Sequence, residues 1–323
     1  MNRNNKTSSL TEAAVITGIL VIISYLSTLI PIIVFFYPTP VIILAKRKGI
    51  KYAALSLLAA CAIITILQGI SIGITYFILY SPFSLALAYG VYRDEDANKT
   101  ILYGSAAYMT SFVVLILLLN TVMGVNFVEQ LKTMSQEGYN LMEQMLFNIP
   151  EGFNSERIEE TLKMVEDYRT VSDFLLSNLF PALIITTSVI SSYINYLVAR
   201  RFARRFSITI KKHEGLSLFT FPRTFMVAMA GMLLVSYLLG MLKFNVGVIQ
   251  LNLFYIIFIA MVLQGLAVIK FFLEKRFLNR SVQVLIIFML LYMAFLFAGV
   301  INIIVITGLL DLAINLRKLN RAV

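Results

Sequence analysis

The feature that most constrains this chain is a series of apolar runs, each close to the length that crosses a lipid bilayer. A membrane-spanning helix needs about 20 consecutive apolar residues. Such runs occupy residues 13–30, 52–68, 70–92, 101–122, 174–198, 225–242 and 251–269. Hydrophobic residues make up 59% of the chain and charged residues 14%, whereas soluble domains have about 45–50% and about 25%. The sequence therefore predicts an all-α fold, a polytopic bundle of transmembrane helices.

Three further segments set the expected number of spans. The run at 13–30 exceeds the roughly 7–15 residues of a signal-peptide core, so we expect an uncleaved first helix. Residues 32–45 are interrupted by Pro38 and Pro40, which predicts a bent or partly unwound segment. The final run, 282–316, is 35 residues long and gives two spans when divided near Ala298 and Gly299. Together these runs predict about ten spans.

The distribution of charge predicts the orientation. Lys and Arg collect on cytoplasmic loops. With ten spans and a cytoplasmic N-terminus, Lys243 is the only external one of the 23 basic residues outside the loop 124–173. That loop holds ten of the 17 acidic residues and four basic ones. We therefore expect both termini in the cytoplasm and the acidic loop outside.

The acidic loop is expected to form an extracellular hairpin of two amphipathic helices. Apolar residues recur in it at helical spacing. The hairpin either lies on the membrane surface and covers the bundle, or serves as a binding lid or a docking site for a partner. For the chain as a whole, we expect a six-span block at 1–203, a basic cytoplasmic linker at 204–224 and a four-span block at 225–323.

Several classes of function are disfavoured by what the sequence lacks. The chain has one cysteine and one histidine, which leaves no disulfide, His-based triad or His-rich metal site. It contains no phosphate-binding loop, zinc-protease motif or nucleophile elbow. The net charge of +10 is explained by cytoplasmic loops, without a nucleic-acid partner. We therefore expect no enzymatic activity, no cofactor and no metal.

Polar and proline residues within the apolar runs are the candidates for a solute cavity. They are either cavity-lining groups or structural contacts between helices, and they comprise Pro31, Pro38, Pro40, Gln68, Tyr76, Tyr80 and Asn195. Asp311 is the clearest intramembrane acid, and it serves either a functional role or a structural pairing at the cytoplasmic end. Ala14 and Gly18 form a small-residue pair that permits close helix packing or contact with a partner.

A basic stretch separates the two blocks. It contains Arg200, Arg201, Arg204, Arg205, Lys211 and Lys212. Such a cluster most often fixes orientation. Its interleaved phenylalanines also suit anionic lipid headgroups or a cytoplasmic protein partner.

Three stretches together resemble the YybS-like family of predicted bacterial membrane proteins, a domain of unknown function. They are YPTPVIILAKRKGIKYAALS, QGLAVIKFFLEKRFL and TGLLDLAINLRK. The first six spans are also distantly similar to substrate-binding subunits of energy-coupling-factor transporters. That resemblance implies a ligand in the outer half, near Pro31 to Pro40, and a membrane partner at Ala14 and Gly18.

These observations predict a multi-pass protein of a bacterial cell membrane. Its expected role is the binding or transport of a small solute without an ATPase of its own. The alternative is a scaffolding protein of the cell envelope that acts through the acidic outer loop or the basic stretch.

Overall fold

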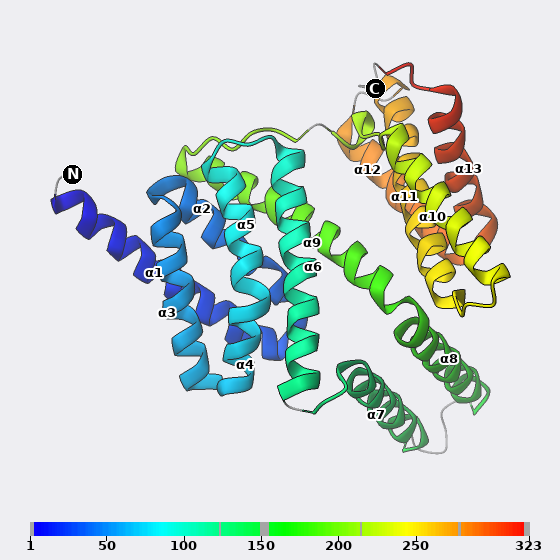
Figure 1. Ribbon diagram of the computed structural model, residues 1–323, viewed down its shortest axis with the longest axis horizontal. Helices are drawn as coiled ribbons and strands as arrows, with labels where there is room; N and C mark the ends of the chain where they lie inside the picture. Colours follow the sequence, from blue (N-terminus) through cyan, green and yellow to red (C-terminus); the bar gives the residue numbers. More distant parts are fainter. Residues whose placement is uncertain (1–2, 123, 149–154, 214, 277–278, 320–323) are drawn as a thin grey trace. The chain divides into compact units, whose positions relative to one another are not determined.

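The fold is entirely helical and divides into two compact units. This computed structural model describes residues 3–122, 124–148, 155–213, 215–276 and 279–319, and none of these residues lies in a strand. The first unit comprises Met1–Ser177 and Leu183–His213, and the second comprises Asn178–Ala182 and Glu214–Val323. Figure 1 shows the helices of both units along the chain. The domain boundaries predicted from the sequence stay a prediction.

The first unit is built around a core in which short helices pack between longer ones. Helix α2 packs against α3 and α5, α1 packs against α3, and α5 packs against α6. Leu20, Tyr37, Leu57, Phe83 and Tyr196 are almost fully buried in this core. The elements in chain order are α1 (Arg3–Leu29), the 3-10 helix η1 (Pro31–Phe36), α2 (Pro38–Lys48), α3 (Ile50–Gln68), α4 (Ile70–Thr75), a π-helical turn (Tyr76–Tyr80), α5 (Ser81–Tyr92), α6 (Ala97–Val122), α7 (Phe127–Phe147), α8 (Ser155–Phe174), a second π-helical turn (Leu175–Leu179), α9 (Phe180–Ala203) and the 3-10 helix η4 (Arg204–Phe206).

The proline-interrupted segment forms η1 followed by α2. Pro31 begins η1 and Pro38 begins α2. Proline suits the first turn of a helix because that turn leaves its backbone N–H groups without intrahelical partners. Gly49 then separates α2 from α3 with a φ of 99°, a conformation that glycine adopts without steric cost. The segment is thus short, bent and partly 3-10 helical.

Helices α7 and α8 form the hairpin expected from the acidic region. The Ser135 and Ser172 hydroxyls are 2.9 Å apart, and the Tyr139 hydroxyl donates to the Tyr168 carbonyl at 3.3 Å. Because rising numbers on α7 pair with falling numbers on α8, the two helices are antiparallel. The predicted connection at Asn148 to Gly152 lies outside the described residues apart from Asn148.

The second unit contains the remaining helices. They are η5 (Leu216–Leu218), α10 (Arg223–Met241), α11 (Gly247–Arg276), α12 (Arg280–Leu296) and α13 (Ala298–Ile314). Helices α11 and α13 approach closely, since a Cβ atom on Gly265 would lie 2.0 Å from the Ile304 carbonyl oxygen. The long final run breaks at Phe297, which is extended with φ −128° and ψ 109°. The helical axes on the two sides of this break differ in direction by 119°.

Seven helices among the described residues are long and apolar enough to cross a membrane. The number is up to eight if the bent pair α12 and α13 is one span. The longest of these helices covers Arg157–Phe206, because α8 continues through the π-helical turn into α9. The polytopic helical fold is therefore confirmed, and the count of ten spans stays a prediction.

Candidate functional site

A groove between α1, α2 and α9 is the candidate binding site in the first unit. Its volume is about 770 Å³, within the range of about 300–1,000 Å³ typical of ligand pockets. Three elements supply most of its apolar wall: α1 with Val15, Ile16, Ile19 and Ile23, α2 with Ile43 and Leu44, and α9 with Val198 and Phe202. The groove is therefore a hydrocarbon-like surface along most of its length.

The apolar wall follows from the two faces of α1. Ala13, Thr17, Leu20 and Ser24 form its buried face, and the Thr17 hydroxyl lies 3.2 Å from the Ser56 carbonyl oxygen of α3. The neighbouring face carries Val15 and Ile19, which are 58% and 37% exposed. Hence one face of α1 packs against α3, and the neighbouring face lines the groove.

Asn195 fixes α9 against the opposite wall. Its amide donates to the Phe35 carbonyl at 2.6 Å and to the Ser191 carbonyl at 2.9 Å. Its amide oxygen accepts from the Thr39 hydroxyl at 3.0 Å. Thr39 itself lines the groove. Asn195 is fully buried and these hydrogen bonds occupy its polar atoms, so its role is to position α2 and α9.

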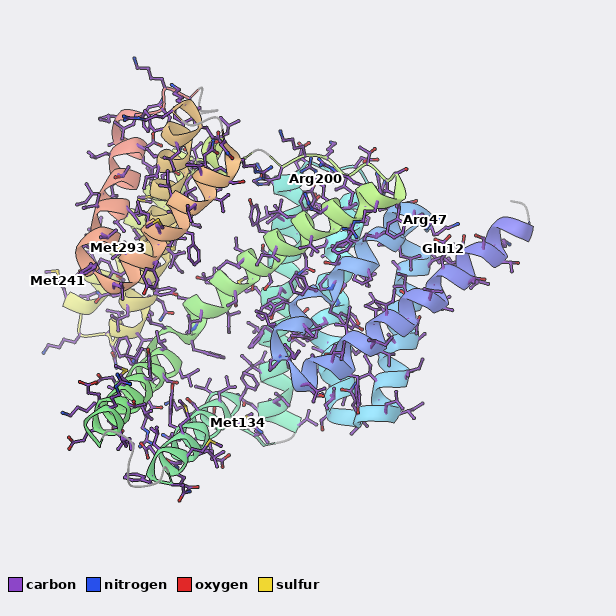
Figure 2. All side chains as sticks on the ribbon, turned by 180° about the vertical axis from the view of Figure 1, so that it is seen from behind. Glu12, Arg47, Met134, Arg200, Met241 and Met293 are labelled. Atoms are coloured by element: carbon purple, nitrogen blue, oxygen red, sulfur yellow. The ribbon has the colours of Figure 1, made fainter. Side chains whose placement is uncertain are left out.

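One end of the groove is charged. Glu12 and Arg47 both line it, and they lie side by side at one end of the first unit (Figure 2). The Glu12 carboxylate lies 3.4 Å from the Arg47 Nε and 3.1 Å from the Lys48 ammonium. On the wall formed by α9, the Arg205 guanidinium lies over the Phe202 ring at 5.4 Å from its centroid. An apolar groove with a charged end suits an amphiphilic molecule.

Further charged segments gather at this end of the first unit. Lys46 at the end of α2 is paired with Asp94 in the turn before α6. Lys211 forms an ion pair with Asp96 of the same turn at 3.1 Å. The Tyr196 hydroxyl donates to the Lys211 carbonyl at 2.8 Å, which holds the chain after α9 against the first unit. Three basic or mixed-charge segments of the sequence therefore meet on one face.

The predicted cavity residues occupy different places. Pro40 lines the groove, whereas Pro31 is exposed, Pro38 is buried, and neither of these two lines it. The rings of Tyr76 and Tyr80 pack against the Tyr37 ring in tilted orientations, with centroids 4.9 and 5.7 Å from that of Tyr37. These two tyrosines are thus part of the packed core near the groove and do not line it.

Two of the predicted polar side chains tie α1 to other helices. The Gln68 amide donates to the Ser24 hydroxyl at 2.9 Å. The Tyr76 hydroxyl lies 3.0 Å from the Ser27 hydroxyl. Both contacts hold the second half of α1 in place, and neither Gln68 nor Tyr76 lines the groove.

Ala14 and Gly18 lie on an exposed face of α1. A Cβ atom on Gly18 would meet nothing within 4 Å. The pair therefore does not bring α1 close to another described part of this chain. Packing against a second protein stays a prediction.

The residues of the basic stretch lie in the last turn of α9, in η4 and in the segment that follows η4. Arg200 and Arg201 end α9, and Arg204 and Arg205 form η4. Apart from partly buried Arg200, these arginines are exposed, as are Lys211 and Lys212 in the following segment. Among the described residues, Lys211 is the only member of the stretch with an ion-pair partner. The arginines thus carry positive charge that the described carboxylates do not neutralise.

Asp311 occupies a separate buried cluster in the second unit. Its carboxylate accepts from the Arg317 guanidinium at 2.9 and 3.2 Å and from the Gln264 amide at 2.7 Å. Arg317 also donates to the Ser217 carbonyl at 2.6 Å. Phe221 completes the cluster by donating its backbone N–H to Gln264 at 3.1 Å. The arrangement ties the segment before α10 to α11 and α13.

Sequence reasoning missed Glu12 and the apolar wall of the groove. A signal for Glu12 was present, since it is the only acidic residue among the first 93. The wall residues gave no comparable signal, because an isoleucine that faces a groove looks like one that faces lipid. No group of three or more potential metal ligands lies together among the described residues.

Comparisons with known proteins agree with a membrane protein. A sequence model of the family described as "Predicted membrane protein (DUF2232)" matches residues 15–312. The uncharacterized protein YybS of Bacillus subtilis (strain 168) is 23% identical over 320 residues, which cover 97% of this chain and 98% of that relative. No solved structure matches the chain. The resemblance to the YybS-like family is confirmed, and that to energy-coupling-factor subunits stays a prediction.

Proposed function

The chain belongs to the DUF2232 family of predicted membrane proteins and is a multi-pass protein of the bacterial cell membrane, and on that premise we propose that it binds a small amphiphilic solute in the groove between α1, α2 and α9. The role is transport-related, without an ATPase, cofactor or catalytic step of its own. The single observation that carries this proposal is the groove of about 770 Å³ with an apolar wall and a charged end.

The groove's fixed geometry supports binding. Asn195 holds α9 to Phe35 and Thr39 through hydrogen bonds of 2.6 and 3.0 Å. Two walls of the groove are therefore held in place before any solute enters. A site that is already formed loses less conformational entropy when it binds its ligand.

The proposed topology has ten spans with both termini in the cytoplasm. The ten spans are the seven single candidate helices, the segment of η1 and α2, and α12 and α13 counted as two separate spans. The ion pairs Lys46–Asp94 and Lys211–Asp96 support one common side for their segments. The tendency of basic loops to stay inside makes that side the cytoplasm, which sets the charged end of the groove at the inner surface.

Native mass spectrometry with a brominated probe tests solute binding. Purified protein in detergent is incubated with 9,10-dibromostearate, whose bromine isotope pattern marks the complex. We expect a one-to-one complex with the native chain and its loss in Ile16→Trp, which fills the groove. Leu102→Trp is the control, since Leu102 is 65% exposed on α6 and does not line the groove. Equal retention by both variants would refute the groove as the site.

Scaffolding through the α7–α8 hairpin is a second candidate. Arg169 joins the two helices by donating to Glu143 at 2.8 Å and to Asn140 at 3.0 Å. At the same time Met134, Met145 and Phe147 are 61%, 70% and 72% exposed. A rigid hairpin with exposed apolar side chains favours a partner or the membrane surface.

Crosslinking in cells separates the two candidate functions. A photoreactive residue is placed at Met134, which is labelled in Figure 2, or at Gly18. Capture of an envelope-assembly protein at Met134 would favour scaffolding. Capture of the membrane subunit of an ATPase complex at Gly18 would favour transport.

A further inference from the structure

We propose that the groove selects a lipid by its anionic headgroup, and that Glu12 holds the headgroup's place as an internal counter-ion while the groove is empty. The inference deepens the proposed function and rests on it, because it requires that the groove accept a hydrocarbon chain.

The apolar wall by itself cannot choose between lipids. Lipid tails are as apolar as a leucine side chain, so a chain that moves from the bilayer into the groove gains little from the hydrophobic effect. Ile16, Ile19 and Phe202 therefore accept any tail of suitable shape. Selection has to come from the charged end.

The charged end presents guanidinium groups on two walls. Arg47 lines the groove from α2, and its side chain is 48% exposed. Arg205 lies over the ring of Phe202, which lines the groove from α9. Arg201 follows the lining residue Val198 by three positions and so shares its face of α9. Guanidinium groups bind phosphate oxygens with two parallel hydrogen bonds, which a point charge cannot do.

The charge at this end is unbalanced in favour of an anion. Among the described residues, neither Arg201 nor Arg205 forms an ion pair, and Glu12 is shared by Arg47 and Lys48. One carboxylate thus serves two cations, while two further arginines have none. Asp94 and Asp96 at this end are already paired with Lys46 and Lys211. An anionic headgroup would therefore complement four basic side chains that share Glu12 alone.

Glu12 stands where a headgroup oxygen would be bound. Its two carboxylate oxygens form ion pairs with the Lys48 ammonium at 3.1 Å and with the Arg47 Nε at 3.4 Å, and its side chain is 27% exposed. A phosphate offers the same donors more oxygens and more charge. Glu12 therefore competes with the headgroup, and its removal should strengthen binding. An anchor that only stabilised the fold would give no such increase.

The occupant is a lipid because the anion site adjoins the apolar groove. Glu12 and Arg47 line the same cavity as Ile19 and Phe202. A free anion would use the charged end and leave a groove of about 770 Å³ without a function. A phospholipid with one net negative charge uses both parts.

Tryptophan fluorescence in nanodiscs tests the proposal. The chain has no tryptophan, so Val15→Trp gives a single reporter at the groove, and Leu102→Trp gives one on exposed lipid-facing surface. Val15 and Leu102 are 58% and 65% exposed. Phosphatidylcholine is replaced stepwise by brominated phosphatidylglycerol, and quenching yields the association constant of phosphatidylglycerol relative to phosphatidylcholine. We expect a ratio of about five at position 15 and close to one at position 102.

Charge variants then identify the recognition residues. In the Val15→Trp background, Arg47→Gln should lower the ratio to about one, and Glu12→Gln should raise it about fivefold further. Lys99→Gln is the control, because Lys99 is an exposed cation that pairs with Glu95 and does not line the groove. If Arg47→Gln fails to fold, Arg205→Gln makes the same test without breaking an ion pair.

The outcomes separate this inference from the proposed function. Equal ratios for the two reporters, or an unchanged ratio in both Glu12→Gln and Arg47→Gln, would overturn headgroup selection. If brominated phosphatidylcholine still quenches position 15 more steeply than position 102, the groove takes a chain and the proposed function survives. If both positions behave as bulk lipid contacts, both proposals fail. Loss of the preference on addition of inorganic phosphate would assign the site to a free anion instead of a lipid.

Discussion

Asp311 and Arg317 form an ion pair in which neither side chain is exposed to solvent, with the Arg317 Nη2 at 2.9 Å from the Asp311 Oδ2. Six residues separate the two, and they join the end of α13 to the segment that follows it. The Gln264 amide supplies a further hydrogen bond at 2.7 Å. A buried charge is tolerated when it is paired and hydrogen-bonded. The pair can therefore hold α13 and the segment that follows it together in the interior of the second unit.

Removal of one partner of this pair should be strongly destabilising. Arg317→Met leaves an uncompensated carboxylate in the interior, and we expect the free energy of unfolding to fall by about 3–5 kcal/mol. The double variant Asp311→Leu/Arg317→Met should recover most of the loss, since no lone charge remains buried. Unfolding in mixed detergent micelles of increasing sodium dodecyl sulfate content measures both. The control Lys99→Met removes an exposed pair and should cost less than about 1 kcal/mol.

Loss of Asn195 should loosen α9 from α2. Asn195→Leu removes the hydrogen bonds to Phe35 and Thr39. We expect the free energy of unfolding to fall by about 1–2 kcal/mol, because each hydrogen bond between membrane helices contributes about 0.6 kcal/mol on average. Ser191→Ala is the matched control on the same helix. The Ser191 hydroxyl is buried without a hydrogen-bond partner among the described residues, so this variant should unfold like the native chain. Equal effects of the two substitutions would contradict the assigned role of Asn195.

Helix packing in the second unit should depend on Gly265. A side chain there meets the Ile304 carbonyl oxygen, so Gly265→Val forces α11 and α13 apart. We expect the free energy of unfolding, in the same measurement, to fall by about 3 kcal/mol or more, which is at the upper end of the cost of overpacking. Gly18→Ala should instead stabilise α1 by up to about 1 kcal/mol, because nothing lies within 4 Å of the new Cβ. Tolerance of valine at position 265 would argue against the close approach of the two helices.

Cysteine labelling should verify the proposed topology. Cys61 is the only cysteine and is buried, so Cys61→Ala provides a silent background. An impermeant maleimide applied to intact cells should label Gln136→Cys on α7 and Lys243→Cys after α10, both at exposed positions. It should label Ser207→Cys only after the membrane is opened. Labelling of Ser207→Cys in intact cells would reverse the whole arrangement, and protection of Lys243→Cys alone would contradict the ten-span count.

The local architecture was accessible from the sequence. Apolar runs of bilayer length predicted the helices, and the break at Phe297 falls one residue from the predicted division at Ala298 and Gly299. The prolines predicted a bent or partly unwound segment at residues 32–45, and the structure has η1 followed by α2 there. These features depend on hydropathy and backbone preferences over a few turns, which a single segment carries by itself. The continuous helix from α8 into α9 was not expected from the sequence, in which polar residues give way to apolar ones at 173–174. Such a change in polarity does not require a break in the backbone.

The sequence by itself determined a helical membrane protein with clustered charge, and only the tertiary structure decided which residues meet. Asn195 bonds to Phe35, 160 positions away, and Glu12 reaches Arg47 where α1 passes α2. Neither contact corresponds to a repeating pattern in the sequence, since each depends on how separate helices pack. The groove has the same origin: its isoleucines are indistinguishable in sequence from those that face lipid. Their arrangement on three helices around one charged end is a property of the packed structure.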